Sequence, residues 1–272
     1  MSDTSYYELV RDYKIDDLIS HCGYTIYPSH FHKRSEITYI VRGSCEFVIN
    51  NRTGTAYADD IIFASAYYPH SYRTSTDVDR YTMLPEPGID GDVIQVIEDL
   101  TFPCLLDDKQ FNREYLLPLF EETYRAQTSK GLIEPAARWI MLKGYTDVIY
   151  GRFLERYRSL MVPRSKHINE LINILNYIEE NSAKRLTLDI LADEFGYNRY
   201  YFSKFFNAYI GESLSNYISA VRIRKFVKLC ELSPDENMLN LAMSVGFESM
   251  PSFYRSFRRV FRCTPTEYFK KS

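Results

Sequence analysis

The sequence lacks the features of secreted, disulfide-stabilised and membrane-spanning proteins. Its five cysteines are scattered and odd in number, and none forms a C-x-x-C pair, which argues against a disulfide framework and a zinc knuckle. The N-terminus has no apolar core of a signal peptide, and no stretch approaches the ~18 uninterrupted apolar residues of a membrane span. We therefore expect a cytoplasmic protein with reduced thiols that does not enter a membrane.

Acidic and basic residues are divided unequally along the chain. Residues 1–163 carry a formal charge of −7 and residues 164–272 one of +4, within a net charge of −3. The basic excess in the second part fits a surface that contacts DNA phosphates, although a solvated charged face would give the same count. The length of 272 residues and the apolar content of 45% favour two folded domains over one compact module or a disordered chain.

Short apolar stretches in the first part alternate with turn residues, which is typical of a sandwich or barrel. The predicted strands are 24–27, 36–41, 46–49 and 61–64. Helices are expected at 112–127 and 135–157, and the second repeats small or apolar residues at helical spacing: Ala137, Ile140, Met141, Gly144 and Val148. Two such helices could pack on the barrel or pair with a second subunit, so we expect a homodimer.

The second part of the chain is helical and contains an internal repeat. Four residues recur after fifty positions: Leu191, Ala192, Gly196 and Tyr197 return as Leu241, Ala242, Gly246 and Phe247. Five more recur after fifty-one: Phe202, Lys204, Phe206, Ser213 and Tyr217 return as Phe253, Arg255, Phe257, Thr264 and Tyr268. So many matches with one insertion indicate two copies of one unit. The basic segment 156–166 is the predicted linker between a domain at 1–155 and this domain at 167–272.

Each copy has the chemistry of a helix-turn-helix unit. A small residue lets two helices cross closely, a glycine permits the turn, and Asn198 or Ser249 caps the second helix. A plain pair of packed helices is the alternative for either copy alone. The outward faces lack glutamate and carry side chains that read base edges or bind phosphates of double-stranded DNA. The predicted DNA contacts are Arg199, Tyr200, Ser203, Lys204, Asn207, Ser252, Arg255, Arg258 and Arg259.

The stretch from about 167 to 271 resembles the DNA-binding domain of the AraC/XylS regulators. The most specific matches are R-I-R-K-F-V-K-L-C at 222–230 and G-F-E-S-M-P-S-F-Y-R-S-F-R-R-V-F-R-C-T-P-T-E-Y at 246–268. The resemblance implies a transcription regulator, with RNA polymerase as a further partner if it activates. It also implies these base readers: Tyr200, Lys204, Pro251, Ser252 and Arg255. Three residues depart from the family's pattern: Pro251 among the readers, Phe226 in place of alanine, and Arg262 in place of glycine.

The first part carries the spacing of a cupin motif. The motif residues are His30, His32, Glu36, Gly43 and, in the position of a second motif, His70. Three imidazoles and a carboxylate on neighbouring strands can bind Fe, Mn, Ni or Zn. Regulators of this family commonly show a similar signature, whose polar residues either line the ligand pocket or hold strands together. We expect no cofactor and no metal, and we assign a small-molecule effector, possibly a sugar, to His30, His32, Glu36, Tyr39, His70 and Tyr72, because aromatic faces suit sugars and ring compounds.

The predicted fold class is therefore α+β, with an N-terminal cupin-like β-barrel, two helices and a C-terminal all-α tandem helix-turn-helix domain. Residues 1–20 resemble the arm that some family members fold over the effector. The expected function is that of an effector-controlled, sequence-specific transcription regulator without catalytic activity. The alternatives are a metal-dependent cupin enzyme with a helical assembly domain and a constitutive DNA-binding protein.

Overall fold

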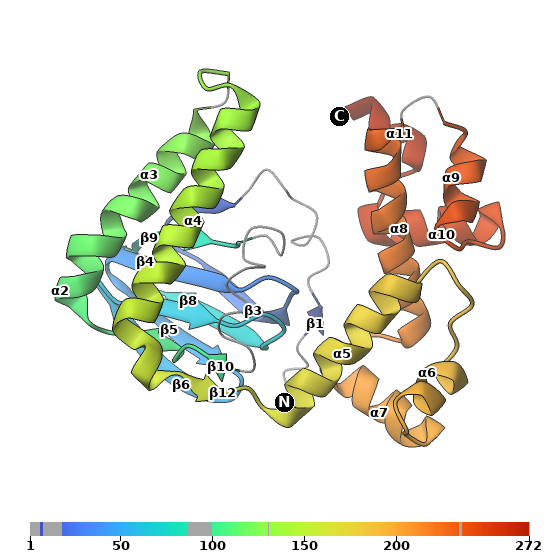
Figure 1. Cartoon of the computed structure of the whole chain (residues 1–272), viewed down its shortest axis with the longest axis horizontal. Coiled ribbons are helices and arrows are strands. Elements are labelled where there is room, and N and C mark those ends of the chain that lie inside the picture. Colours follow the sequence, from blue (N-terminus) through green and yellow to red (C-terminus); the bar gives the residue numbers. More distant parts are fainter. Residues whose placement is uncertain (1–5, 8–17, 86–99, 130, 234–235, 272) are drawn as a thin grey trace. The chain divides into compact units, whose positions relative to one another are not determined.

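Two five-stranded β-sheets form the centre of the first part of the chain (Figure 1). The computed structural model describes residues 6–7, 18–85, 100–129, 131–233 and 236–271. In order across the first sheet the strands are β1 (Tyr6–Tyr7), β3 (Ile26–Phe31), β8 (His70–Thr74), β5 (Ser44–Ile49) and β6 (Arg52–Tyr57). In the second sheet they are β11 (Leu105–Leu106), β7 (Ile61–Ala64), β4 (Glu36–Arg42), β9 (Asp79–Met83) and β2 (Ile19–Cys22).

Three of the four predicted strands are confirmed, because 36–41, 46–49 and 61–64 lie within β4, β5 and β7. The fourth, 24–27, is only half right, since β3 begins at Ile26. Strand β6 escaped prediction because its sequence, R-T-G-T-A-Y, shows little apolar alternation. Its Gly54 lies under the Phe47 ring, where an added Cβ would be 2.5 Å from the ring's Cζ. The strand is therefore set by cross-strand packing, which a local pattern does not show.

Helices follow the sheets in the first part of the chain. They are α2 (Lys109–Phe111), the π-helical turn η2 (Asn112–Leu116), α3 (Leu117–Thr128), α4 (Pro135–Tyr157) and the 3-10 turn η3 (Arg158–Leu160). Both predicted helices are confirmed, and α4 has the expected bounds. Nowhere in the described residues is a helix both long and apolar enough to cross a membrane.

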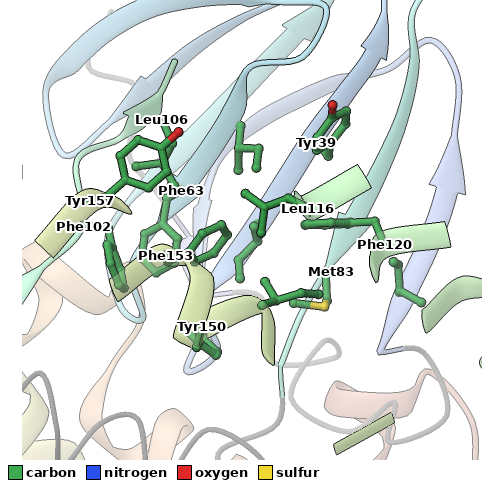
Figure 2. Packing of buried hydrophobic residues seen from close by; sticks show 14 of the residues in the cluster. Tyr39, Phe63, Met83, Phe102, Leu106, Leu116, Phe120, Tyr150, Phe153 and Tyr157 are labelled. Atoms are coloured by element: carbon green, nitrogen blue, oxygen red, sulfur yellow. The ribbon is translucent and has the colours of Figure 1, made fainter. Parts of the chain in front are cut away.

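Helices α3 and α4 cover one face of the second sheet. Tyr39 and Phe63 of this sheet join Phe120 of α3 and Phe153 of α4 in one buried cluster (Figure 2). Because neighbouring side chains of a strand point to opposite faces, Glu36, three residues before Tyr39, points away from the helices. The face of β4 that carries Glu36 therefore points into the space between the two sheets.

The predicted linker at 156–166 is partly built into the first domain. Helix α4 continues to Tyr157, and β12 (Val162–Pro163) pairs antiparallel with β10 (Leu100–Thr101). The chain divides into two compact units, 1–168 and 169–272. Most of the arm predicted at 1–20 lies outside the described residues, but Tyr6 and Tyr7 pair in parallel with His30 and Phe31.

The second unit consists of helices. They are α5 (Lys166–Asn181), α6 (Leu188–Glu194), α7 (Arg199–Ile210), α8 (Leu214–Leu232), α9 (Met238–Ser244), α10 (Met250–Phe261) and α11 (Pro265–Lys271). Helices α6 and α7 form the first helix-turn-helix unit, and α9 and α10 form the second (Figure 1). Helix α8 joins them, and its 19 residues at about 1.5 Å each span roughly 28 Å.

Candidate functional site

The first helix-turn-helix unit is held by the residues that the repeat singles out. Ala192 is buried where α6 meets α7, and Gly196 in the turn has φ +70°, a conformation that glycine adopts without steric cost. The side chain of Asn198 accepts a hydrogen bond of 2.8 Å from the Tyr201 backbone N–H. This cap satisfies one of the free N–H groups at the start of α7 and fixes where the helix begins.

The second unit repeats this arrangement, but its turn glycine packs closely against the neighbouring backbone. Gly246 has φ +101°, and an added Cβ would lie 2.7 Å from the Ala183 carbonyl oxygen, so both the backbone angle and the packing require glycine. Ser249 occupies the N-cap position of α10, but its side chain makes no capping hydrogen bond. Pro251 lies in the first turn of α10, where a missing N–H costs nothing.

Helix α7 presents most of its predicted DNA contacts to solvent. Arg199, Tyr200, Lys204 and Asn207 are exposed and Ser203 is half-buried. The Tyr200 side chain is 76% exposed. The Arg199 guanidinium lies 3.0 Å from the Asp189 carboxylate of α6, and an exposed pair of this kind contributes little to stability. Arg199 can therefore exchange this partner for a phosphate.

Helix α10 carries the basic residues of the second unit and no acidic one. Arg255 and Arg258 are exposed, and Ser252 is half-buried. Arg259 does not point outward as expected, because its Nη2 donates a hydrogen bond of 2.6 Å to the Asn216 carbonyl oxygen of α8. This side chain ties α10 to the connecting helix instead of extending the exposed face.

The R-I-R-K motif of α8 binds the end of α5 rather than facing outward. The Arg222 guanidinium donates to the carbonyl oxygens of Ser182, at 2.7 Å, and Lys184, at 3.0 Å. Lys225 donates to the Glu179 carbonyl oxygen, and Arg224 forms an ion pair with the Glu179 side chain. Cations at a helix C-terminus satisfy its free carbonyl groups. Sequence reasoning used this motif only for the family resemblance and missed its structural role.

A histidine cluster lies between the two sheets and consists of His30, His32, Glu36 and His70. All four residues are at most 2% exposed, and their candidate ligand atoms lie within 4.8 Å of one another. Burial lowers the pKa of His70 to about 3, with the Glu36 carboxylate opposing the shift. The sequence thus predicted correctly that these four side chains meet, because Glu36 and the histidines face the same interior.

Two further residues were assigned to the same site, and one of them lies elsewhere. Tyr72 points into the interior beside His70, with ring centroids 5.5 Å apart, and burial and the Glu36 carboxylate raise the pKa of Tyr72 well above its ordinary value. Tyr39 lies on the helix side of the second sheet, and its hydroxyl donates to Asp59 at 2.8 Å. The assignment of Tyr39 is wrong because its odd spacing from Glu36 puts it on the opposite face.

A cavity of about 670 Å³ opens on the first sheet. Its lining includes Tyr27, Glu46, Tyr72 and Arg73, and Glu46 and Arg73 are direct cross-strand partners. Tyr72 is the one residue of the predicted effector set in this lining. The cavity therefore differs from the histidine cluster in place and in chemistry, since it offers aromatic, acidic and basic groups to a ligand of organic size.

Two family models match the chain in the order of its two units. Residues 20–138 match the model described as an AraC-like ligand binding domain, and residues 191–271 match a helix-turn-helix domain. The Transposon Tn10 TetD protein of Escherichia coli is 33% identical over 105 residues, which cover 39% of this chain and 75% of that protein. The chain belongs to the AraC family of transcription regulators.

Other AraC family relatives match along most of the chain. The Melibiose operon regulatory protein of Escherichia coli is 23% identical over 260 residues, covering 90% of this chain and 84% of that protein. Among solved structures, ToxT from Vibrio cholerae is similar at 12% identity and a TM-score of 0.46, over 93% of this chain and 95% of that one. This AraC family member is a DNA-binding transcription regulator with a ligand-binding domain.

Proposed function

We propose that the protein is a homodimer that binds a specific DNA sequence through both helix-turn-helix units, and that a carbohydrate bound to the N-terminal domain alters this binding. The observation that carries the proposal is the pair of exposed faces on α7 and α10. Neither helix contains an acidic residue, and both present arginine or lysine beside smaller polar groups, the side chains that read bases and bind phosphates.

The spacing of the two units supports contact with adjacent major grooves. Helix α8 is roughly 28 Å long, and one turn of B-DNA is about 34–36 Å. Tyr200 and Lys204 of α7, and Ser252 and Arg255 of α10, are the proposed base readers. The exposed Arg199 and Arg258 are the proposed phosphate contacts, because they flank the readers on the same helices.

The test uses single substitutions of the central reader in each unit. Lys204→Ala and Arg255→Ala should each weaken binding by about 1–3 kcal/mol, or roughly 5- to 150-fold. Fluorescence anisotropy with a site selected from a random-sequence DNA library would measure the affinity of the full chain. Lys228→Ala removes an equal charge from the exposed side of α8 and is the matched control. Unchanged specific binding in both reader variants would refute the assignment.

The cavity on the first sheet is the proposed effector site. Its volume of about 670 Å³ is that of a typical small-molecule site. The half-buried Tyr27 and the exposed Glu46 and Arg73 in its lining can stack on and hydrogen-bond a sugar. The similarity to a protein named for the melibiose operon also supports a carbohydrate. The remaining residues of the predicted effector set, apart from Tyr72, lie in the histidine cluster or the core and do not line this cavity.

A thermal-shift screen of mono- and disaccharides with the full chain tests the effector. A binding sugar should raise the melting temperature, and Arg73→Ala should abolish the shift without changing DNA affinity in the absence of sugar. Coupling requires different affinities for two states, so the same sugar should change the DNase footprint on the selected site. A sugar that stabilises the chain but leaves both footprint and DNA affinity unchanged would contradict regulation by this ligand.

The proposed dimer contact is a stripe on α4. Ala137, Ile140, Gly144, Val148 and Gly151 recur at three- and four-residue steps and are exposed, with Ile140 at 64% and Val148 at 48%. Within the described part of the chain, a Cβ added to either glycine would meet nothing within 4 Å. Small residues beside apolar ones allow a second helix to approach closely, which supports pairing of two α4 helices.

A further inference from the structure

The histidine cluster contains ring nitrogens that are oriented by the backbone. Each Nδ1 faces a carbonyl oxygen two residues away: His30 that of Pro28 at 2.9 Å, His32 that of Arg34 at 2.8 Å, and His70 that of Tyr68 at 2.7 Å. A carbonyl oxygen can only accept, so each Nδ1 carries a hydrogen, and in the neutral form of such a ring the lone pair lies on Nε2. Metal-bound histidines are oriented by this kind of second hydrogen bond.

The lone pairs are directed at the Glu36 carboxylate. Oxygen Oε2 of Glu36 lies 3.4 Å from Nε2 of His32 and 3.9 Å from Nε2 of His70. In these tautomers neither Nε2 nor an ionised Glu36 can donate to the other, so the buried contact is unfavourable unless a proton or a cation lies between the atoms. A cation between these atoms would turn the repulsion into bonds.

The spacing of the four groups is that of a coordination shell. Metal–nitrogen and metal–oxygen bonds of about 2.0–2.2 Å place the ligand atoms of a tetrahedral site roughly 3.4 Å apart, and wider pairs occur at higher coordination numbers. The measured 3.4 and 3.9 Å, and the limit of 4.8 Å over the whole cluster, fall in this range. The ring centroids of His30 and His70 are 4.3 Å apart, and those of His32 and His70 are 4.9 Å apart.

We propose that the histidine cluster binds one divalent first-row transition-metal ion. Imidazole nitrogens favour Zn²⁺, Fe²⁺, Co²⁺, Ni²⁺ or Mn²⁺ over Mg²⁺ and Ca²⁺, which prefer all-oxygen sites. His30 lies in β3 and His70 in β8 of the first sheet, His32 directly follows β3, and Glu36 lies in β4 of the second sheet, so the ion cross-links the two sheets of the ligand-binding domain. None of the four cluster residues lines the cavity on the first sheet.

The test measures metal binding by the full chain. After chelator treatment and dialysis, the wild-type protein should take up one Zn²⁺ or Co²⁺ per chain by mass spectrometry of the metal, and the ion should raise its melting temperature. His70→Gln should lower the Zn²⁺ affinity on the order of 100-fold or more, since even second-shell changes cost 10- to 100-fold. The matched control is His21→Gln, because His21 lies outside the cluster, stacked on Tyr81.

If His70→Gln does not fold, a measurement on the wild-type chain still tests the proposal. X-ray absorption of the Zn²⁺-loaded wild-type protein should show three imidazoles and one carboxylate at about 2.0–2.2 Å. The proposal is overturned if the wild-type chain retains no ion after loading, if His70→Gln binds it as tightly as wild type, or if the spectrum shows fewer than two imidazoles. DNA affinity, measured separately, decides the proposed function and does not enter this result.

Discussion

Arg262 ends helix α10 in a left-handed conformation, with φ +59°. The equivalent residue of the first unit, fifty-one positions earlier, is Gly211 with φ +73°. A residue with a Cβ pays a steric penalty there that glycine avoids. Arg262 thus adopts nearly the same backbone conformation as Gly211, but its Cβ makes this conformation strained.

We predict that Arg262→Gly raises the free energy of unfolding by about 0.5–1 kcal/mol, because the relief of strain exceeds the entropy that glycine adds to the unfolded chain. Urea unfolding of the full chain, followed by far-UV circular dichroism, measures this change. Arg262→Ala is the control, since it removes the same side chain but keeps the Cβ, and it should stay within about 0.5 kcal/mol of wild type. Equal stabilisation by both variants would show that charge, not backbone strain, is responsible.

Phe226 is the second departure from the family's pattern, and the structure explains how the fold accommodates it. Its ring is fully buried and lies edge-on to Phe253 of α10, with centroids 4.6 Å apart. The larger side chain therefore fills the centre of the second unit's core, where it joins α8 to the helix that carries Arg255.

At the scale of elements, α8 connects the two helix-turn-helix units, and its basic residues fix it to the end of α5. We predict that Arg222→Ala lowers the free energy of unfolding by about 1–3 kcal/mol, since two carbonyl oxygens lose a charged partner. Arg222 also lies over the Phe247 ring at 5.9 Å, so the loss should reach the second unit. The same denaturation measurement checks this expectation.

Arg222→Lys is the informative companion variant. It keeps the charge, but a single ammonium cannot reproduce the fork that reaches both carbonyl groups, so its stability should lie between those of Arg222→Ala and wild type. Lys228→Ala, on the exposed side of α8, should have an effect within about 0.5 kcal/mol. If Arg222→Ala behaved like Lys228→Ala, the anchor would contribute nothing to stability.

At the scale of the whole molecule, the proposed dimer depends on the stripe of α4. We predict that Val148→Lys converts the dimer to a monomer, because a buried lysine in the contact would lack a partner. Light scattering coupled to size-exclusion chromatography would show the change in mass. Gln110→Lys adds the same charge at an exposed position of α2 and should leave the mass unchanged. A dimer that survives Val148→Lys would place the contact elsewhere.

The sequence by itself determined the family, the helices and the meeting of the four cluster residues. Helical spacing predicted α4 and the two helix-turn-helix units, because each is a local pattern of apolar residues, and each helix-turn-helix unit has a glycine in its turn. The cluster was predictable because a cupin-like spacing puts its members on neighbouring strands. Even the error at Tyr39 had a signal in the sequence, since its odd offset from Glu36 points it to the other face of β4.

Only the tertiary structure decided which polar groups face each other. Arg259 was predicted to contact DNA and Arg222 was used only for the family motif, but both donate to carbonyl oxygens distant along the chain. The separation of the cavity on the first sheet from the histidine cluster likewise depends on how the two sheets are stacked. Contacts across sheets and between distant helices are fixed by packing of the whole domain, which no local pattern encodes.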